Sequence, residues 1–155
     1  MAKLSRRKFL TGGAIVVGGG GALYAAGGQN VFYSIITEAS AATALDAPTA
    51  HNQAVAGDIT LIDIRRPDEW KKTGSGEGAQ RLDLRRKDFT DALLKITGGK
   101  TDVPVALICA RGVRSARVSN QLQKAGFTNI IDVPEGMLGS AAGPGWLKRG
   151  LPVVK

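Results

Sequence analysis

The stretch Val103-Pro-Val-Ala-Leu-Ile-Cys-Ala-Arg-Gly-Val-Arg-Ser115 joins two kinds of predicted secondary structure and contains the single cysteine of the chain, Cys109. Its first part, Val103–Ile108, is apolar and rich in β-branched residues, which predicts a buried strand. The segment that follows, Val113–Ala125, repeats apolar residues at helical spacing, which predicts a helix. Cys109 therefore lies between the end of a strand and the start of a helix.

The rest of the chain after residue 41 alternates in the same way between apolar runs and helical patterns. Further strands are predicted at Ile59–Ile64 and Asn129–Val133, with weaker signals around Ala44–Leu45 and Gln80–Leu82. Helices are predicted at Ala47–Ala56, Pro67–Lys72 and Lys87–Ile96. This alternation predicts one α/β domain with a mainly parallel central sheet and helices on both of its faces. Ligands of such sheets bind beyond the carboxyl ends of the strands, where Cys109 lies.

The loop from Cys109 to Arg114 has the composition of an anion-binding loop. Its backbone N–H groups are expected to converge on one point, and the dipole of the following helix adds positive potential there. Arg111 and Arg114 supply full charges, and Gly112 permits a backbone conformation that other residues avoid. Together these features predict a lowered pKa and a nucleophilic thiolate for Cys109, whereas the alternative is a buried structural cysteine.

The same loop resembles the active-site loop of the rhodanese-like sulfurtransferases, whose pattern is Cys-x-x-Gly-x-Arg/Thr-Ser. Cys109, Gly112, Arg114 and Ser115 match that pattern. The family often has a basic residue at the second position, where this chain has Ala110. Arg111 at the third position is a candidate to compensate for that difference.

Two further regions extend the resemblance over residues 43–155. The run Leu61–Trp70 is similar to the family's Asp-x-Arg signature followed by a Glu-Trp/Tyr helix, and the segment Gly136–Val153 is similar to its closing Gly…Trp…Gly-x-Pro-Val pattern. The segment Thr73–Ala79 lacks the histidine that the family often has there, which we interpret as a subfamily difference. Asp63 and Arg65 of the first region are candidate supporting residues, either as an ion pair that braces the site or as an ordinary surface pair.

The resemblance implies a sulfurtransferase that moves a sulfane sulfur from an anionic, thiosulfate-like donor to a thiophilic acceptor through a persulfide on Cys109. It also implies that the following loop residues bind the substrate: Ala110, Arg111, Gly112, Val113, Arg114 and Ser115. The acceptor would be cyanide-like or a thiol, and neither a cofactor nor a metal is expected. Gly136, Met137 and Leu138 either edge the pocket or form an ordinary turn.

Two other functions remain open at this point. One is a non-catalytic sulfur-carrier or scaffold domain that docks to a periplasmic partner. The other is a phosphatase or an arsenate-reductase-like enzyme that uses the same Cys–Arg geometry. Phosphatases that resemble this family have one more residue between the cysteine and the arginine, so the six-residue loop from Cys109 to Arg114 favours sulfur chemistry.

The N-terminal residues predict export. Ser5-Arg-Arg-Lys-Phe-Leu10 resembles the twin-arginine motif, and an uncharged stretch of 29 residues with eight glycines follows from Phe9 to Thr37. The run Ala39-Ser-Ala41 has the Ala-x-Ala pattern of a cleavage site. We expect residues 1–41 to be a signal peptide read by the twin-arginine export machinery, with retention as an inner-membrane anchor as the alternative. The domain of residues 42–155 is accordingly expected in the periplasm or elsewhere outside the cytoplasm.

Length, charge and composition narrow the remaining function classes. The 155 residues suffice for one domain, and one cysteine excludes an internal disulfide and any zinc site of several cysteines. The net charge of +8 would suit a nucleic-acid partner, but 17 Lys and Arg against 12 acids leave only +5 for residues 42–155. Since no nucleic-acid module motif is present, this charge favours a small anionic substrate and no nucleic acid. The single histidine, His51, lies on a predicted helix and is expected to have a surface or core role.

Overall fold

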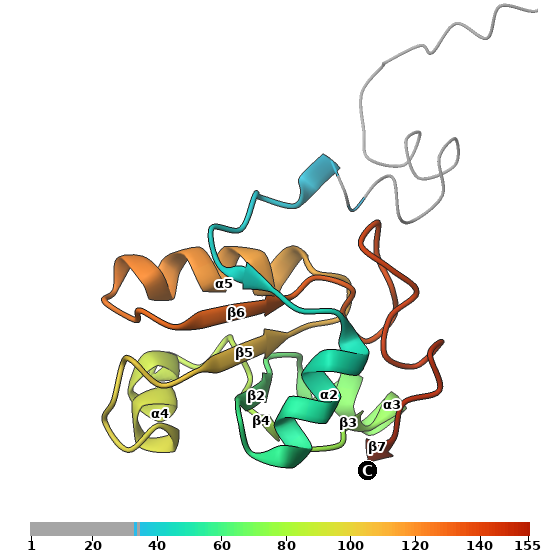
Figure 1. Ribbon diagram of the computed structural model, residues 1–155, viewed down its shortest axis with the longest axis horizontal. Coiled ribbons are helices and arrows are strands. Elements are labelled where there is room, and N and C mark those ends of the chain that lie inside the picture. Colours follow the sequence, from blue (N-terminus) through green and yellow to red (C-terminus); the bar gives the residue numbers. More distant parts are fainter. Residues whose placement is uncertain (1–32, 34) are drawn as a thin grey trace, which may run out of the picture.

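A five-stranded parallel sheet organises the computed structural model, which describes residue 33 and residues 35–155 (Figure 1). The strands run in the order β1-β6-β5-β2-β4, and every neighbouring pair is parallel. Their bounds are β1 (Thr43–Ala44), β2 (Thr60–Asp63), β4 (Ala79–Arg81), β5 (Val105–Ile108) and β6 (Ile130–Val133). The predicted strands are thereby confirmed, each within one or two residues of its expected bounds.

Helices cover both faces of the sheet, as the sequence predicts. The helices are α2 (Ala47–Ala56), α3 (Pro67–Thr73), α4 (Phe89–Ile96) and α5 (Val113–Lys124). Helix α2 has the expected bounds because the Asp46 side chain accepts from the Thr49 N–H at its start and Gly57 takes a left-handed conformation at its end.

The predicted helix α4 is confirmed with a start two residues later than Lys87, because the chain makes two turns before the helix begins at Phe89. The turns are closed by hydrogen bonds from the Arg86 N–H to the Asp83 carbonyl and from the Phe89 N–H to the Arg86 carbonyl. Arg85 pairs with Asp83 and Arg86 pairs with Asp88. The basic run at residues 85–87 therefore lies in these turns, and two of its three charges are paired with aspartates.

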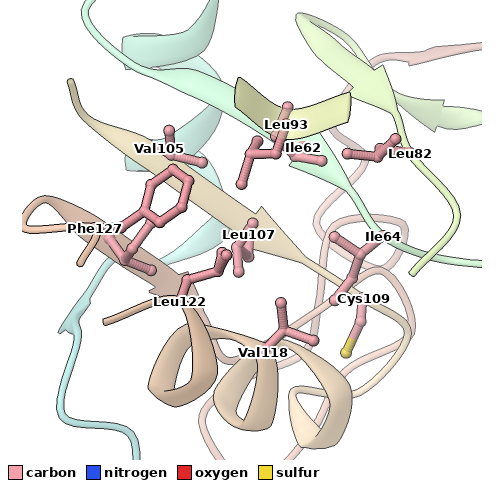
Figure 2. Close-up of a cluster of buried hydrophobic side chains, with 11 residues drawn as sticks. Ile62, Ile64, Leu82, Leu93, Val105, Leu107, Cys109, Val118, Leu122 and Phe127 are labelled. Carbon is pink, nitrogen blue, oxygen red and sulfur yellow. The ribbon is translucent and has the colours of Figure 1, made fainter. Parts of the chain in front are cut away.

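Side chains alternate between two cores along the central strands. On β5, Val105 and Leu107 face the core under α4 and α5, where Cys109 also lies (Figure 2). Ala106 and Ile108 face the opposite core, under α2. Because β5 is buried on both faces, its carboxyl end is rigid, and it fixes the position of the residue that follows, Cys109.

A small antiparallel ladder between β3 (Ser75–Gly76) and β7 (Val153–Val154) was not predicted. Each strand has only two residues, too few to give an alternation in the sequence. A Cβ at Gly76 would lie 2.6 Å from the Trp146 ring, so glycine is required for this packing. The ladder brings the C-terminal strand against the segment that follows α3.

Most of the predicted export signal, including the twin-arginine motif, lies outside the described residues. Within residue 33 and residues 35–155, the structure contains no helix that is long and apolar enough to cross a membrane. Residues 35–41 lead from that region into β1 along α5 (Figure 1).

Candidate active site

Cys109 lies directly after β5 and faces a cavity of about 380 Å³. The residue is only 1% exposed, so its sulfur is reached through this cavity and not from the general surface. The residues that line the cavity come from four parts of the chain: Tyr33, Arg66, Glu69, Cys109, Ala110, Arg111, Val113, Arg114 and Leu138. Of the predicted loop residues, four of the six that follow Cys109 line the cavity, whereas Gly112 and Ser115 do not.

The loop turns sharply into α5 at Gly112, which has a φ of +82°. A Cβ at this position would meet the Pro134 carbonyl oxygen at 2.4 Å, so glycine is needed both for its conformation and for the close approach. Within the described residues, the N–H groups of Val113 and Arg114 have no backbone acceptor, because they belong to the first turn of the helix. These donors remain available to an anion at the helix N-terminus.

A second loop, residues 134–139, packs against the cysteine loop and is hydrogen-bonded to it. The Met137 N–H donates to the Cys109 carbonyl and the Leu138 N–H donates to the Ala110 carbonyl, each at 2.8 Å. A Cβ at Gly136 would lie 2.6 Å from the Ala110 carbonyl group. Of the three candidate pocket residues here, only Leu138 lines the cavity, whereas Met137 is fully buried and Gly136 packs against the cysteine loop.

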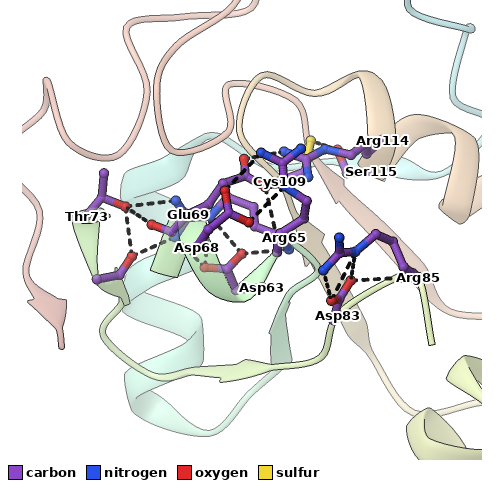
Figure 3. Close-up of polar contacts among 12 residues, drawn as sticks. Asp63, Arg65, Asp68, Glu69, Thr73, Asp83, Arg85, Cys109, Arg114 and Ser115 are labelled. Atoms are coloured by element: carbon purple, nitrogen blue, oxygen red, sulfur yellow. Dashed lines mark hydrogen bonds and ion pairs between the residues drawn. The ribbon is translucent and has the colours of Figure 1, made fainter. Parts of the chain in front are cut away.

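Arg114 forms a two-point ion pair with Glu69 of α3 (Figure 3). Its Nη1 and Nη2 donate to the two carboxylate oxygens of Glu69 at 2.8 and 2.7 Å. The geometry fixes the guanidinium at the cavity wall and neutralises much of its charge. The sequence did not single out Glu69, which is 45 residues away from Arg114.

Asp63 and Arg65 form a buried ion pair rather than a surface pair. Arg65 Nε and Nη2 donate to the Asp63 carboxylate at 2.9 and 2.7 Å, and Nη2 also donates to the Gly74 carbonyl at 2.6 Å. Its Nη1 donates to Thr73 Oγ1 at 2.9 Å. The pair thus ties the end of β2 to the end of α3, the helix that carries Glu69.

Arg111 lies at the mouth of the cavity under the ring of Tyr33. Its Cζ is 5.3 Å from the ring centroid, and its Nη1 donates to the Gly139 carbonyl at 3.0 Å. Tyr33 and Arg111 also line an adjoining cavity of about 220 Å³. Tyr33 falls within the predicted signal, so nothing in the sequence indicates that it lines the cavity.

Residues 38–41, which precede β1, are held along α5. The Ala41 N–H donates to Asn120 Oδ1 at 3.1 Å, and Asn120 Nδ2 donates to the Ala39 carbonyl at 3.0 Å. Glu38 pairs with Arg117 at 3.4 Å. These contacts hold the backbone of the predicted cleavage site against the domain.

His51 lies away from the cysteine loop and has a structural environment. Its Nε2 is 2.9 Å from Glu77 Oε2, and its ring meets Trp146 edge-on at 5.4 Å. The described part of the chain contains no group of three or more His, Cys, Asp or Glu side chains placed to hold a metal ion.

The Glu69–Arg114 pair predicts how stability depends on pH. Burial alone would raise the pKa of Glu69, but hydrogen bonds from Arg114 and from the Arg66 N–H outweigh it and lower the pKa below 4.5. The ionised carboxylate therefore stabilises the fold fully above pH 4.5, and this stabilisation is lost as the pH falls through the lower folded-state pKa. Glu69→Gln is expected to reduce the free energy of unfolding by about 1–2 kcal/mol at pH 7 and by less in acid. Urea unfolding at several pH values tests this, and a deficit that is the same at all pH values would contradict it.

Comparisons with known proteins agree with this geometry. Residues 44–142 match the rhodanese-like domain family. An uncharacterised protein of Rickettsia prowazekii (strain Madrid E) is 30% identical over 98 residues, which cover 59% of this chain and 80% of that protein. The solution structure of the 30 kDa polysulfide-sulfur transferase homodimer from Wolinella succinogenes is similar with a TM-score of 0.57 and 29% identity, over 73% of this chain and 78% of that one.

A Rhodopseudomonas palustris structure, described as a possible tyrosine phosphatase, has a TM-score of 0.53 and 21% identity over 73% of this chain and 85% of that chain. An identity of 21% shows that the two proteins share a fold and nothing more. The match to the family runs from β1 past the loop at residues 134–139 and includes the whole cysteine loop. This chain therefore belongs to the rhodanese-like domain family.

Proposed function

We propose that the domain is a sulfurtransferase that transfers a sulfane sulfur through a persulfide on Cys109. The observation that carries the proposal is the position of the Cys109 sulfur, which faces a cavity at the N-terminus of α5 inside a six-residue loop. The helix N-terminus and the loop N–H groups favour an anion at that point. A persulfide anion is such a group, and its size suits the short loop.

The proposed reaction is a double displacement. The Cys109 thiolate attacks the outer sulfur of thiosulfate, a sulfur–sulfur bond forms, and sulfite leaves with the electron pair of the broken bond. The resulting persulfide anion is then attacked at its outer sulfur by a cyanide-like or thiol acceptor, and Cys109 is regenerated. No cofactor takes part in these steps.

The two loop arginines have different tasks in this proposal. Arg111, at the mouth of the cavity, attracts the anionic donor. The Tyr33 ring and the Gly139 carbonyl hold the Arg111 guanidinium in place. Arg114 is already paired with Glu69, so it shapes the wall and contributes a partly neutralised charge. Arg66 lines the same cavity and adds a further cation at its edge.

Sulfur loading of the intact protein tests the proposal. Purified protein is incubated with thiosulfate or with inorganic polysulfide, the donor class named for the Wolinella succinogenes relative. Intact-mass spectrometry is expected to show the addition of one sulfur atom that a thiol reductant removes. A folded protein that gains no sulfur from either donor would refute the proposal.

Activity assays beside the sulfur loading separate the alternatives. A sulfur-carrier domain that docks to a periplasmic partner would load sulfur but turn over negligibly with cyanide. A phosphatase or arsenate-reductase-like enzyme would hydrolyse an aryl phosphate or reduce arsenate without prior sulfur loading.

We propose further that the domain works outside the cytoplasm and that the predicted cleavage site stays uncut. The two hydrogen bonds between Asn120 and the backbone of Ala39 and Ala41 support retention of the N-terminal segment. A protease must take up its substrate as a free extended strand, and these bonds hold the segment against the domain. Expression of the full chain in a host with twin-arginine export should yield a membrane-associated protein that retains Tyr33. In Asn120→Ala, a soluble form starting after residue 41 should increase several-fold. Mass spectrometry of the N-terminus measures the cleavage. Complete cleavage of the wild-type chain at Ala41 would contradict retention.

A further inference from the structure

Glu69 places a carboxylate in a cavity that has to bind anions in the proposed reaction. It lies in the first turn of α3 and lines the same cavity as Cys109 and Arg114 (Figure 3). The Glu69 side chain is 18% exposed and that of Arg114 is 30% exposed, so both charges are largely shielded from solvent. A carboxylate in this position repels an anionic donor and limits the negative charge that the cavity accepts.

The Glu69 carboxylate is held in one position by donors on both of its oxygens. Its Oε1 accepts from Arg114 Nη2 at 2.7 Å, and its Oε2 accepts from Arg114 Nη1 at 2.8 Å. Its Oε2 also accepts from the Arg66 N–H at 3.0 Å. The Glu69 carbonyl accepts from Thr73 Oγ1, which in turn accepts from the buried Arg65. These contacts keep the carboxylate at the cavity wall beside the Arg114 guanidinium.

Carboxylates balance the charges of Arg66 and Arg114, which both line the cavity. Arg114 is paired with Glu69, and Arg66 is paired with Asp68 at 3.0 Å. Among the described residues that line the cavity, Glu69 is the one acid, whereas Asp68 is 66% exposed beside it. A charge in a partly enclosed cavity interacts more strongly with a ligand than a charge that is surrounded by water. Glu69 is therefore the carboxylate with the largest influence on the charge that a donor meets.

We propose that Glu69 is a specificity-determining residue that favours singly charged sulfane-sulfur donors over dianions such as thiosulfate. This inference rests on the proposed function and narrows its donor class. Because Glu69 already balances the Arg114 guanidinium, a second negative charge on a donor gains little from that guanidinium. Thiosulfonates and organic persulfide anions carry a single charge and belong to the favoured class.

Two donors of nearly the same shape isolate the effect of charge. Thiosulfate and methanethiosulfonate both attach a sulfane sulfur to a tetrahedral sulfur, and a methyl group in the second replaces a charged oxygen of the first. With either donor, the Cys109 thiolate attacks the sulfane sulfur, a new sulfur–sulfur bond forms, and the old one breaks. The leaving group takes the electron pair, as sulfite with two negative charges or as methanesulfinate with one. Both reactions give the same persulfide anion.

The ratio of the loading rates with these two donors measures the charge selection. Full-length wild type and Glu69→Gln are incubated with each donor at neutral pH, and sulfur uptake is followed by intact mass. The amide keeps a hydrogen-bond acceptor for Arg114 but has no charge, so the ratio should shift about tenfold toward thiosulfate. A change in Cys109 reactivity or in stability affects both donors alike and cancels in the ratio. An unchanged ratio in Glu69→Gln would overturn the proposal.

Three further variants show whether the effect comes from the charge of Glu69 and acts through Arg114. Glu69→Asp keeps the charge and should keep the wild-type preference. Asp88→Asn is the matched control, because it also takes a carboxylate from an arginine, Arg86, and neither residue lines the cavity among the described residues. Its ratio should stay within about twofold of the wild type. In Glu69→Gln combined with Arg114→Gln, the ratio should return toward the wild type, and a ratio that stays shifted would contradict the role of Arg114.

Alkylation of Cys109 distinguishes a failure of this inference from a failure of the proposed function. Iodoacetate and iodoacetamide have nearly the same shape and differ by one negative charge, and their reaction needs no sulfur transfer. The ratio of the iodoacetate rate to the iodoacetamide rate should rise several-fold in Glu69→Gln and stay unchanged in Asp88→Asn. If the wild type takes up no sulfur from either donor, the proposed function fails. In that case an unchanged alkylation ratio in Glu69→Gln would overturn the charge selection as well, and a raised ratio would support it.

Discussion

Cys109→Ser is expected to take up no sulfur from thiosulfate or polysulfide and to lose at least about a thousandfold of any thiocyanate formation from thiosulfate and cyanide. Serine fills the same small space after β5, so the fold and the cavity should survive. The hydroxyl is a far weaker nucleophile than a thiolate and forms no persulfide. Initial rates and intact-mass spectra of the variant and the wild type measure the effect.

Ser119→Ala is the matched control for this substitution, since it also changes a small buried side chain, whose hydroxyl has no hydrogen-bond partner within the described residues. The control should retain the wild-type rate to within about twofold. Sulfur transfer by Cys109→Ser at an undiminished rate would show that another group carries the sulfur. Loss of an aryl phosphatase activity in Cys109→Ser would instead support the phosphatase alternative.

The second large effect is expected from Arg65→Met, which removes the cation from the buried pair and leaves Asp63 as an unpaired buried charge. Breaking such a pair reduces the free energy of unfolding by about 3–5 kcal/mol. The variant also loses the hydrogen bonds to Thr73 and to the Gly74 carbonyl, so the end of α3 is released. Urea unfolding followed by circular dichroism gives the change.

Arg66→Met is the matched control for Arg65→Met. Arg66 is the next residue in the chain, and its side chain, which pairs with Asp68 and Glu69, is 47% exposed. Its replacement should leave the unfolding midpoint nearly unchanged. In the double variant Asp63→Asn with Arg65→Met, part of the lost stability should return because no buried charge remains. Equal effects of Arg65→Met and Arg66→Met would contradict the structural importance of the buried pair.

The sequence predicts those parts of the fold that depend on local patterns. The apolar runs give β2, β5 and β6, and Asp46 and Gly57 give the bounds of α2, because strand burial and helix capping act over a few residues. The cysteine loop is predicted for the same reason, since a strand end, a glycine and a helix start follow one another directly.

Contacts between distant residues could not be predicted in this way. The sequence shows Glu69 and Arg114 as separate charged residues, and only the packing of α3 beside the cysteine loop makes them a pair. Tyr33 lies in an uncharged stretch that has the composition of an export signal, and composition alone does not show that its ring lies beside Arg111 at the cavity.

The backbone contact between the cysteine loop and residues 134–139 has a consequence for how this site can change during evolution. Gly112 meets Pro134, and Gly136 meets Ala110, with no room for even one additional carbon atom at either glycine. An insertion that enlarged the ring to the size suited to phosphate would collide with this second loop unless the second loop were remodelled as well. In the proposed function, the preference for sulfur over phosphate therefore depends on two segments about 25 residues apart that must mutate together.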